Sequence, residues 1–428
     1  MTTPEVLVVG DWHLASVTSA GLLSYGYRVH AWDADAAARS VLAAAGGTAA
    51  EPGVRPELRQ AREQGRYTVV PDETALAEIV ATVELAVVGY DSRTTVDGEM
   101  IDTRIAEAVG LLLRLGRGRC PVLLSSQVRA GTCDQLLTSA GEPTDSPLLV
   151  HVPENLRLGR ALDDFRHPQR VVIGCNADRL PEPVERLAAR WDPARVVRVN
   201  LVEAELIKHG TNGFLSACIV FANDLGWLAR DLGADPFRVL AGVQADPRIG
   251  SHAPLRPGQA YAGATLQRDV RALQEAGEPC GRDGLFAAIS RANSNHALAP
   301  VGYLDRLLDG LAERRICLYG LTYKPNISTL RDSPALRLAG ELAAHGCRVT
   351  GYDPLADDLP PGDIHRYPTP AEAAAGADCV VLVTAHDGFD EIDFATLRPR
   401  RRRLLDLCGA GGRVKGLADW QVYDMWRN

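Results

Sequence analysis

Short apolar runs that end in a glycine or a polar residue alternate along the chain with longer segments whose apolar residues recur every three or four positions. The run at residues 5–10 (EVLVVG) is followed by a proline-free segment and then by residues 28–33 (RVHAWD). This order predicts strand, helix and strand, which is the βαβ unit of a parallel sheet. Further strands are predicted at residues 85–89, 122–126 and 171–174.

A different pattern fills the middle of the chain. Residues 201–235 contain no proline, and their apolar positions recur close to the helical period, so one long helix is predicted there. Residues 285–313 are predicted to be helical as well. A second set of βαβ elements follows, with strands at 316–320, 348–353, 379–384 and 404–407 and a helix at 334–345.

These elements predict an α/β chain with two doubly wound Rossmann-like domains that are joined by a helical middle domain with a long central helix. The predicted domains are an N-terminal dinucleotide-binding domain at residues 1–200, a helical dimerisation domain at 201–312 and a C-terminal domain at 313–428.

Composition narrows the class of protein. The 428 residues carry a net charge of −8, which argues against a nucleic-acid partner. The nine cysteines are scattered singly without a CxxC pair, so no metal site is predicted and a reducing compartment is favoured. The N-terminus shows no signal peptide and no apolar run reaches membrane-spanning length, so we expect a cytoplasmic protein without a membrane partner.

The first predicted strand ends in a modified dinucleotide turn, Gly10-Asp11-Trp12-His13-Leu14-Ala15. The usual G-x-G-x-x-G pattern needs its second glycine so that the pyrophosphate can approach the backbone, and here that position is tryptophan. An acidic residue, Asp33, ends the second strand and favours NAD over NADP. We expect Gly10, Trp12, His13, Leu14 and Asp33 to contact NAD, although a domain that has lost its cofactor is the alternative.

Six longer strings occur in a fixed order. They are PENLRLG at 153–159 with the following DFRHPQRVVIG at 164–174, EAELIK at 203–208 with Asn212, DPRIG at 246–250, PGQAYAGATLQRD at 257–269, GLTYKPN at 320–326 and LRDSPA at 330–335. Together they resemble the UDP-glucose/GDP-mannose dehydrogenase family over essentially the whole chain.

The resemblance implies a function. In this family the N-terminal domain binds NAD, the C-terminal domain binds the nucleotide of the sugar, and the long helix builds a homodimer. The enzymes oxidise C6 of the hexose twice, and a cysteine captures the intermediate aldehyde as a thiohemiacetal before the thioester is hydrolysed. The implied substrate is a nucleotide sugar, most simply a UDP-sugar.

Residues carried over from the family motifs make up a candidate site. Lys208 is expected to stabilise an alkoxide, and it is one of only three lysines in the chain. Asn212 lies one helical turn further on and is expected to bond the sugar or a water, while Glu154 acts near C6 and Asp269 closes the thiol loop. The remaining assignments are Ser126, Gln127 and Arg331 to the cofactor, and Asn155, Leu156, Arg157, Tyr261, Gly263 and Lys324 to the substrate.

The family's cysteine is missing. The position of the nucleophile in the loop holds Thr265, and an unassisted hydroxyl is a far weaker nucleophile than a thiol. Gln127 stands where the family has a threonine that positions the hydrolytic water, and Leu158 replaces a frequent second glutamate.

Three functions follow as hypotheses. The first is an NAD-dependent enzyme that makes only the C6 aldehyde, or that reduces it again after C5 epimerisation with Glu154 or Asp269 as the base. The second is a full UDP-glucose 6-dehydrogenase that oxidises the hydrated aldehyde without covalent capture. The third is a non-catalytic nucleotide-sugar-binding protein, which Trp12 would favour.

Overall fold

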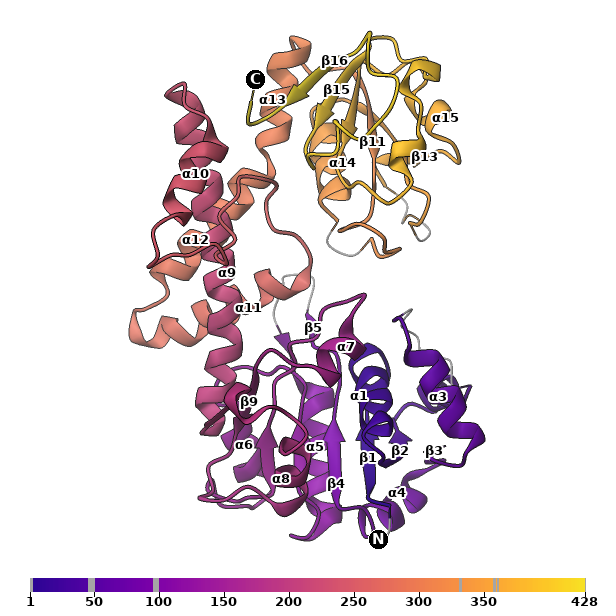
Figure 1. Ribbon diagram of the computed structural model, residues 1–428, viewed down its shortest axis with the longest axis vertical. Helices are drawn as coiled ribbons and strands as arrows, with labels where there is room; N and C mark the ends of the chain where they lie inside the picture. Colours follow the sequence, from indigo (N-terminus) through magenta and orange to yellow (C-terminus); the bar gives the residue numbers. More distant parts are fainter. Residues whose placement is uncertain are drawn as a thin grey trace. The chain divides into compact units, whose positions relative to one another are not determined.

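The computed structural model describes residues 3–44, 51–94, 100–330, 333–356, 359 and 362–427. The chain forms two compact units, Met1–Gly210 and Thr211–Asn428, and the division falls within the long helix α9 (Figure 1). Each unit contains one Rossmann-like sheet, so the predicted fold class is confirmed.

The first unit is built on an eight-stranded sheet in the order β10-β9-β8-β7-β4-β1-β2-β3. Neighbouring strands are parallel except β8 and β9, which pair antiparallel through His151 and Gly174. The strand order reverses between β1 and β4, and the carboxyl ends of such strands are where α/β sheets bind ligands. The strands are β1 (Glu5–Val9), β2 (Arg28–Trp32), β3 (Tyr67–Val69), β4 (Leu85–Val88), β7 (Val122–Leu124), β8 (Leu149–His151), β9 (Val171–Gly174) and β10 (Val196–Val199).

Helices pack on both faces of this sheet. Alternation along β1 explains why: Val6 and Val8 enter the core beneath α1 and α3, while Leu7 and Val9 enter the core beneath α4 and α5. The other elements of the unit are α1 (His13–Ser24), α2 (Ala36–Ala43), α3 (Val54–Glu63), α4 (Glu73–Val80), β5 (Arg93–Thr94), β6 (Met100–Ile101), α5 (Thr103–Gly116), α6 (Thr132–Ser139), α7 (Ala161–Arg166), α8 (Glu182–Ala188) and η1 (Pro193–Arg195).

The predicted long helix is α9 (Leu201–Asp231), which ends four residues before the predicted boundary. Asp235 caps the next helix by accepting from the amides of Phe237 and Arg238. The region predicted to be helical at 285–313 contains two helices, and Pro300, which has no backbone donor, lies in the first turn of the second one. This helical region contains α10 (Pro236–Gln244), α11 (Ala264–Gly277), η2 (Glu278–Cys280), α12 (Gly284–Ala297) and α13 (Ala299–Leu308).

The second sheet has six parallel strands in the order β13-β12-β11-β14-β15-β16. Its elements are β11 (Arg315–Tyr319), α14 (Pro334–Ala344), β12 (Arg348–Tyr352), β13 (Ile364–Arg366), α15 (Pro370–Ala374), β14 (Cys379–Leu382), η3 (Phe389–Glu391), η4 (Phe394–Thr396), β15 (Arg403–Asp406) and β16 (Gln421–Asp424). Within the described part of the chain, no helix is both long and apolar enough to cross a membrane.

Candidate active site

Lys208 and Glu154 lie together in the first unit. The Lys208 side chain is buried on α9, and its Nζ donates to the backbone carbonyl of Glu154 at 2.6 Å. The same ammonium lies 3.6 Å from the Glu154 carboxylate. A buried charge needs such acceptors to offset lost hydration, and they fix the ammonium beside a carboxylate that is itself part-exposed. The arrangement joins an acid–base group to a cation able to stabilise an alkoxide.

Asn212 and Asp269 form a second pair, in the second unit. Asn212 follows Lys208 by one turn of α9, so helix geometry puts the two on one face. Its amide donates to the carboxylate of Asp269, which is fully buried and also accepts from Arg268 Nε at 3.2 Å. Asp269 is therefore committed to neighbouring side chains and holds Asn212 in place.

Thr265 lies in the first turn of α11 and is exposed. The preceding Gly263 has φ +79°, and a side chain there would meet the ring of Tyr323 at 3.1 Å, which explains the glycine. Tyr261 is anchored by a bond from its amide to Asn293 Oδ1 at 2.9 Å, and burial raises the pKa of its phenol to about 12. The loop thus presents a hydroxyl at the position assigned to the nucleophile.

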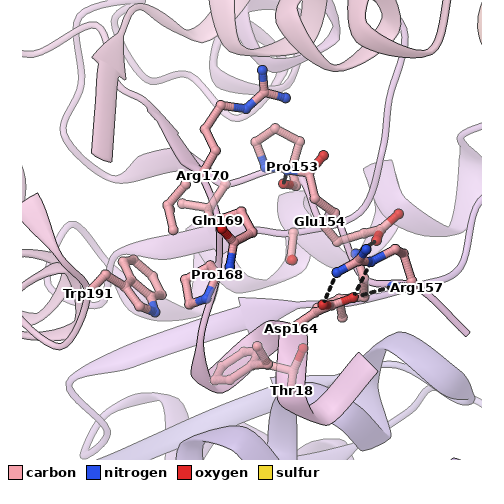
Figure 2. A pocket seen from close by; sticks show the side chains of 15 residues that line it. Thr18, Pro153, Glu154, Arg157, Asp164, Pro168, Gln169, Arg170 and Trp191 are labelled. Carbon is pink, nitrogen blue, oxygen red and sulfur yellow. Dashed lines mark hydrogen bonds and ion pairs between the residues drawn. The ribbon is translucent and has the colours of Figure 1, made fainter. Parts of the chain in front are cut away.

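Glu154, Asn155, Leu156 and Arg157 line a pocket of about 320 Å³ in the first unit (Figure 2). The guanidinium of Arg157 is held by Asp164 through bonds of 2.9 and 2.6 Å, so this arginine shapes the wall of the pocket. Apolar residues that were not predicted as site residues also line this pocket, among them Val152, Phe165, Pro168, Val171 and Trp191.

A larger pocket, of about 740 Å³, lies in the second unit. Lys324 lines it as predicted, beside two arginines that the sequence patterns did not single out, Arg256 and Arg413. Asp406, at the end of β15, accepts from the backbone amides of Cys408, Gly409, Ala410 and Gly411 and so fixes one wall. Three cations in one pocket suit a phosphate-bearing ligand. Ligands bind at the carboxyl ends of the strands in sheets of this kind, so the position of Asp406 at the end of a strand could have predicted this wall of the pocket.

The dinucleotide turn of the first unit requires a glycine at its first position, residue 10. Gly10 has φ +153°, and a Cβ there would lie 2.5 Å from the carbonyl oxygen of Gly89. Trp12 is the N-cap of α1 and leaves 41% of its surface exposed, so the indole is not part of the core. Asp33 is fully buried, and its carboxylate accepts from the amide of Asp35 at 2.7 Å and from Arg104 at 3.1 Å.

These features fit NAD in part. The parallel sheet, the glycine turn and the start of α1 are the elements that hold a dinucleotide, and Gly10, His13 and Leu14 are the residues that would face its pyrophosphate. Against this, the amide of Leu14 donates to the carboxylate of Asp91 at 3.0 Å. Sequence reasoning missed Asp91, although its place just after β4, at the reversal of strand order, was the signal that pointed to it.

Two residues assigned to the cofactor, Ser126 and Gln127, are buried and bonded to neighbouring protein groups. Ser126 is buried and its Oγ accepts from the amide of Tyr90 at 2.7 Å. Gln127 is buried as well, and its amide donates to His209 Nδ1 at 3.1 Å. Arg331 lies outside the described residues.

Comparisons with known proteins agree along the chain. Models of the UDP-glucose/GDP-mannose dehydrogenase family match with the NAD binding domain at residues 4–192, the central domain at 202–295 and the UDP binding domain at 317–410. The UDP-glucose 6-dehydrogenase of Pseudomonas aeruginosa is 30% identical over 94% of this chain and 92% of its own length. That of Rhizobium meliloti is 30% identical over 94% of each chain.

Solved structures give the same result. A UDP-glucose dehydrogenase from Pyrobaculum islandicum matches with a TM-score of 0.86 and 27% identity, covering 99% of this chain and 97% of that one. The chain therefore belongs to the UDP-glucose/GDP-mannose dehydrogenase family and is an NAD-dependent oxidoreductase that acts on a CH–OH group.

Proposed function

We propose that this enzyme oxidises the C6 hydroxymethyl group of a UDP-sugar by two electrons only, and either releases the aldehyde or returns it to the alcohol after chemistry at C5. The observation that carries the proposal is the Lys208–Glu154 pair, which retains acid–base chemistry, combined with a threonine in place of the thiol. The full four-electron reaction needs a further step for which this chain offers no cysteine nucleophile in the loop.

The first oxidation needs a base and a cation. The Glu154 carboxylate accepts the proton of the C6 hydroxyl, and the Lys208 ammonium stabilises the alkoxide while C6–H leaves with its electron pair. Bound NAD supplies the acceptor for that hydride. Asn212, held by Asp269, orients the sugar oxygen or a water beside it. The product of these steps is the C6 aldehyde.

The fate of the aldehyde depends on Thr265. A threonine hydroxyl adds weakly to a carbonyl, and an ester formed from it would hydrolyse more slowly than a thioester. The C6 carbonyl acidifies the C5 hydrogen, so a base near it permits epimerisation. We assign that base to Glu154, because the Asp269 carboxylate is fully buried and bonded to Asn212 and Arg268.

A UDP-sugar is the proposed substrate because the second unit matches the UDP binding domain of the family and contains the pocket lined by Lys324, Arg256 and Arg413. The three cations suit a diphosphate. The relatives from Pseudomonas aeruginosa and Rhizobium meliloti are named for UDP-glucose, which makes UDP-glucose the first sugar to test.

The test is incubation with NAD and a panel of UDP-sugars in deuterated water, with products identified by mass spectrometry. The proposal predicts at most one NADH per consumed sugar, no uronic acid, and deuterium at C5 if epimerisation occurs. Two NADH per sugar together with a uronic acid would overturn it in favour of a full UDP-glucose 6-dehydrogenase that oxidises the hydrated aldehyde.

We also propose a cytoplasmic homodimer formed along α9. Phe214, Phe221 and Leu228 are 65%, 50% and 55% exposed, and their seven-residue spacing puts them in one stripe on the helix. An exposed apolar stripe of this length is typical of a protein–protein interface. All nine cysteines are free, which supports a reducing compartment.

A further inference from the structure

The start of α1 is bonded to a residue far away in the sequence. The first amides of a helix have no acceptor within the helix, and Trp12, as the N-cap, provides no side-chain acceptor. The first intrahelical bond of α1 runs from Ser16 to the carbonyl of Trp12 at 3.0 Å. The amide of Leu14 instead donates to Asp91 Oδ2 at 3.0 Å, across 77 residues of sequence. A carboxylate after β4 therefore caps the helix that follows β1.

This amide belongs to the group that a dinucleotide needs. Helix N-termini bind anions through their free N–H groups and the positive end of the helix dipole, and the pyrophosphate of a dinucleotide sits at the helix after the first strand. A phosphate oxygen and the Asp91 carboxylate would compete for the Leu14 amide. Both are anions that the positive end of the α1 dipole would stabilise. The two anions cannot both accept from the Leu14 amide along its N–H direction.

The groups around Asp91 add to the competition. His13 Nδ1 lies 3.9 Å from Asp91, and the other ring nitrogen of His13 is bonded to Glu51 at 3.1 Å. Asp11 pairs with Arg104 at 2.7 Å, and the same guanidinium holds Asp33. The turn thus has four carboxylates, from Asp11, Asp33, Glu51 and Asp91, facing one guanidinium and one imidazole. A pyrophosphate would add negative charge to a region that already has an excess of it.

We propose that Asp91 is an internal anionic latch on the dinucleotide site, and that NAD binds only when the Asp91 carboxylate leaves the amide of Leu14. The latch is a property of this chain's own residues and rests on the NAD dependence of the family, not on the proposed chemistry at C6. It makes the affinity for NAD lower than the fold alone would allow. Partial exposure of the Asp91 side chain gives it room to move aside.

The test is calorimetric titration of NAD into the full-length protein and into three variants. D91N removes the charge and keeps an amide oxygen of similar size, while D91A removes the contact. D178N is the matched control, because Asp178 is an exposed aspartate of the same unit in the loop after β9. The proposal predicts that D91N and D91A bind NAD at least about tenfold more tightly than the unaltered protein and that D178N binds as the unaltered protein does.

Equal or weaker binding by both Asp91 variants would overturn the latch. Absence of NAD binding in all four proteins would overturn it too, because Asp91 would then not be what limits binding. This experiment measures NAD binding and not the reaction at C6. Its result can therefore contradict the latch without contradicting the proposed C6 chemistry, and the latch can be correct even if the proposed C6 chemistry is wrong. If D91A does not fold, the isosteric D91N decides, with its fold checked by circular dichroism.

Discussion

At the scale of single residues, the candidate active site contains side chains whose environments differ sharply. Lys208 is buried and directly bonded to Glu154, whereas Thr265 is exposed at the start of a helix. Burial strengthens the interaction of an ammonium with a developing alkoxide, because there is little water to screen it. Under the proposed function, the Lys208 ammonium and the Thr265 hydroxyl therefore act on different steps of the reaction.

Replacing Lys208 with methionine tests the first of these roles. K208M removes the charge but keeps the length of the chain, so we expect kcat to fall by about 100- to 1,000-fold while KM for the sugar changes little. Steady-state kinetics with the consumed UDP-sugar measures this. K415M is the matched control, because Lys415 is an exposed lysine that contacts neither pair, and its kcat should be unchanged. A K208M enzyme with normal kcat would contradict the role.

Restoring the thiol tests the second role. T265C places a sulfur at the first turn of α11, where the helix dipole favours the thiolate. We expect the NADH released per sugar to rise from one or less toward two, with a uronic acid as the new product, because a thiohemiacetal is a substrate for a second hydride loss. T265S serves as the control and should leave the stoichiometry unchanged. An unchanged product in T265C would mean that Thr265 is not the residue that limits oxidation.

The titration of Asp91 gives a pH dependence for NAD binding. Partial burial raises the pKa of Asp91 to about 6, against the influence of His13, with Glu154 and Asp11 as the other charged groups facing it. A raised pKa means that the carboxyl is neutral below about pH 6 and charged above it, so the latch weakens as pH falls. We expect NAD affinity to rise by several-fold between about pH 8 and about pH 5.

The control for this profile is D91N, which cannot titrate at position 91. D91N leaves every other residue of the turn unchanged, so the difference between the two profiles isolates Asp91. A profile with the same slope in D91N as in the unaltered protein would show that another group causes the pH dependence.

At the scale of secondary-structure elements, α9 carries residues of the candidate active site and also an exposed apolar stripe. It carries Lys208 and Asn212 one turn apart, and further along it exposes Phe214, Phe221 and Leu228 at a heptad spacing. A helix of 31 residues is long enough to serve both a site and an interface.

A charge in the middle of the exposed stripe tests the interface. F221D should convert a dimer to a monomer at micromolar concentration, because an unpaired carboxylate buried at an interface costs several kcal/mol. Size-exclusion chromatography with light scattering measures the mass. I249D introduces the same charge at an exposed apolar residue off α9 and should remain dimeric. A dimeric F221D protein would place the interface elsewhere.

Local sequence patterns predicted the elements but not all of the contacts. The strand β1, the helix α9 and the second βαβ set were predicted because apolar periodicity is a local property. The helical region at 285–313 was predicted without its division into α12 and α13, which Pro300 marks. The hydrogen bond between Leu14 and Asp91 could not be predicted from local patterns, because these residues are 77 positions apart and their proximity depends on the strand order.

At the scale of the whole molecule, the chain is a member of its family with two Rossmann-like sheets. The family motifs assigned both Lys208 and Glu154 to the candidate site, because several motifs in a fixed order carry information that single residues lack. They did not predict that Arg157 is held by Asp164 or that Asp33 is held by Arg104, because a motif gives the order of residues and not which side chains bond to one another in space. The fold agrees with that of the family, while the departures of the cofactor turn and the nucleophile loop stay predictions from the sequence.

The most direct measurement of the central claim is a single turnover with a UDP-sugar carrying two deuterium atoms at C6, followed by mass spectrometry of the cofactor and the sugar. The account predicts that no more than one of the two deuterium atoms leaves C6 and that the carbon never reaches the acid. Loss of both deuterium atoms, with oxygen gained at C6, would contradict it.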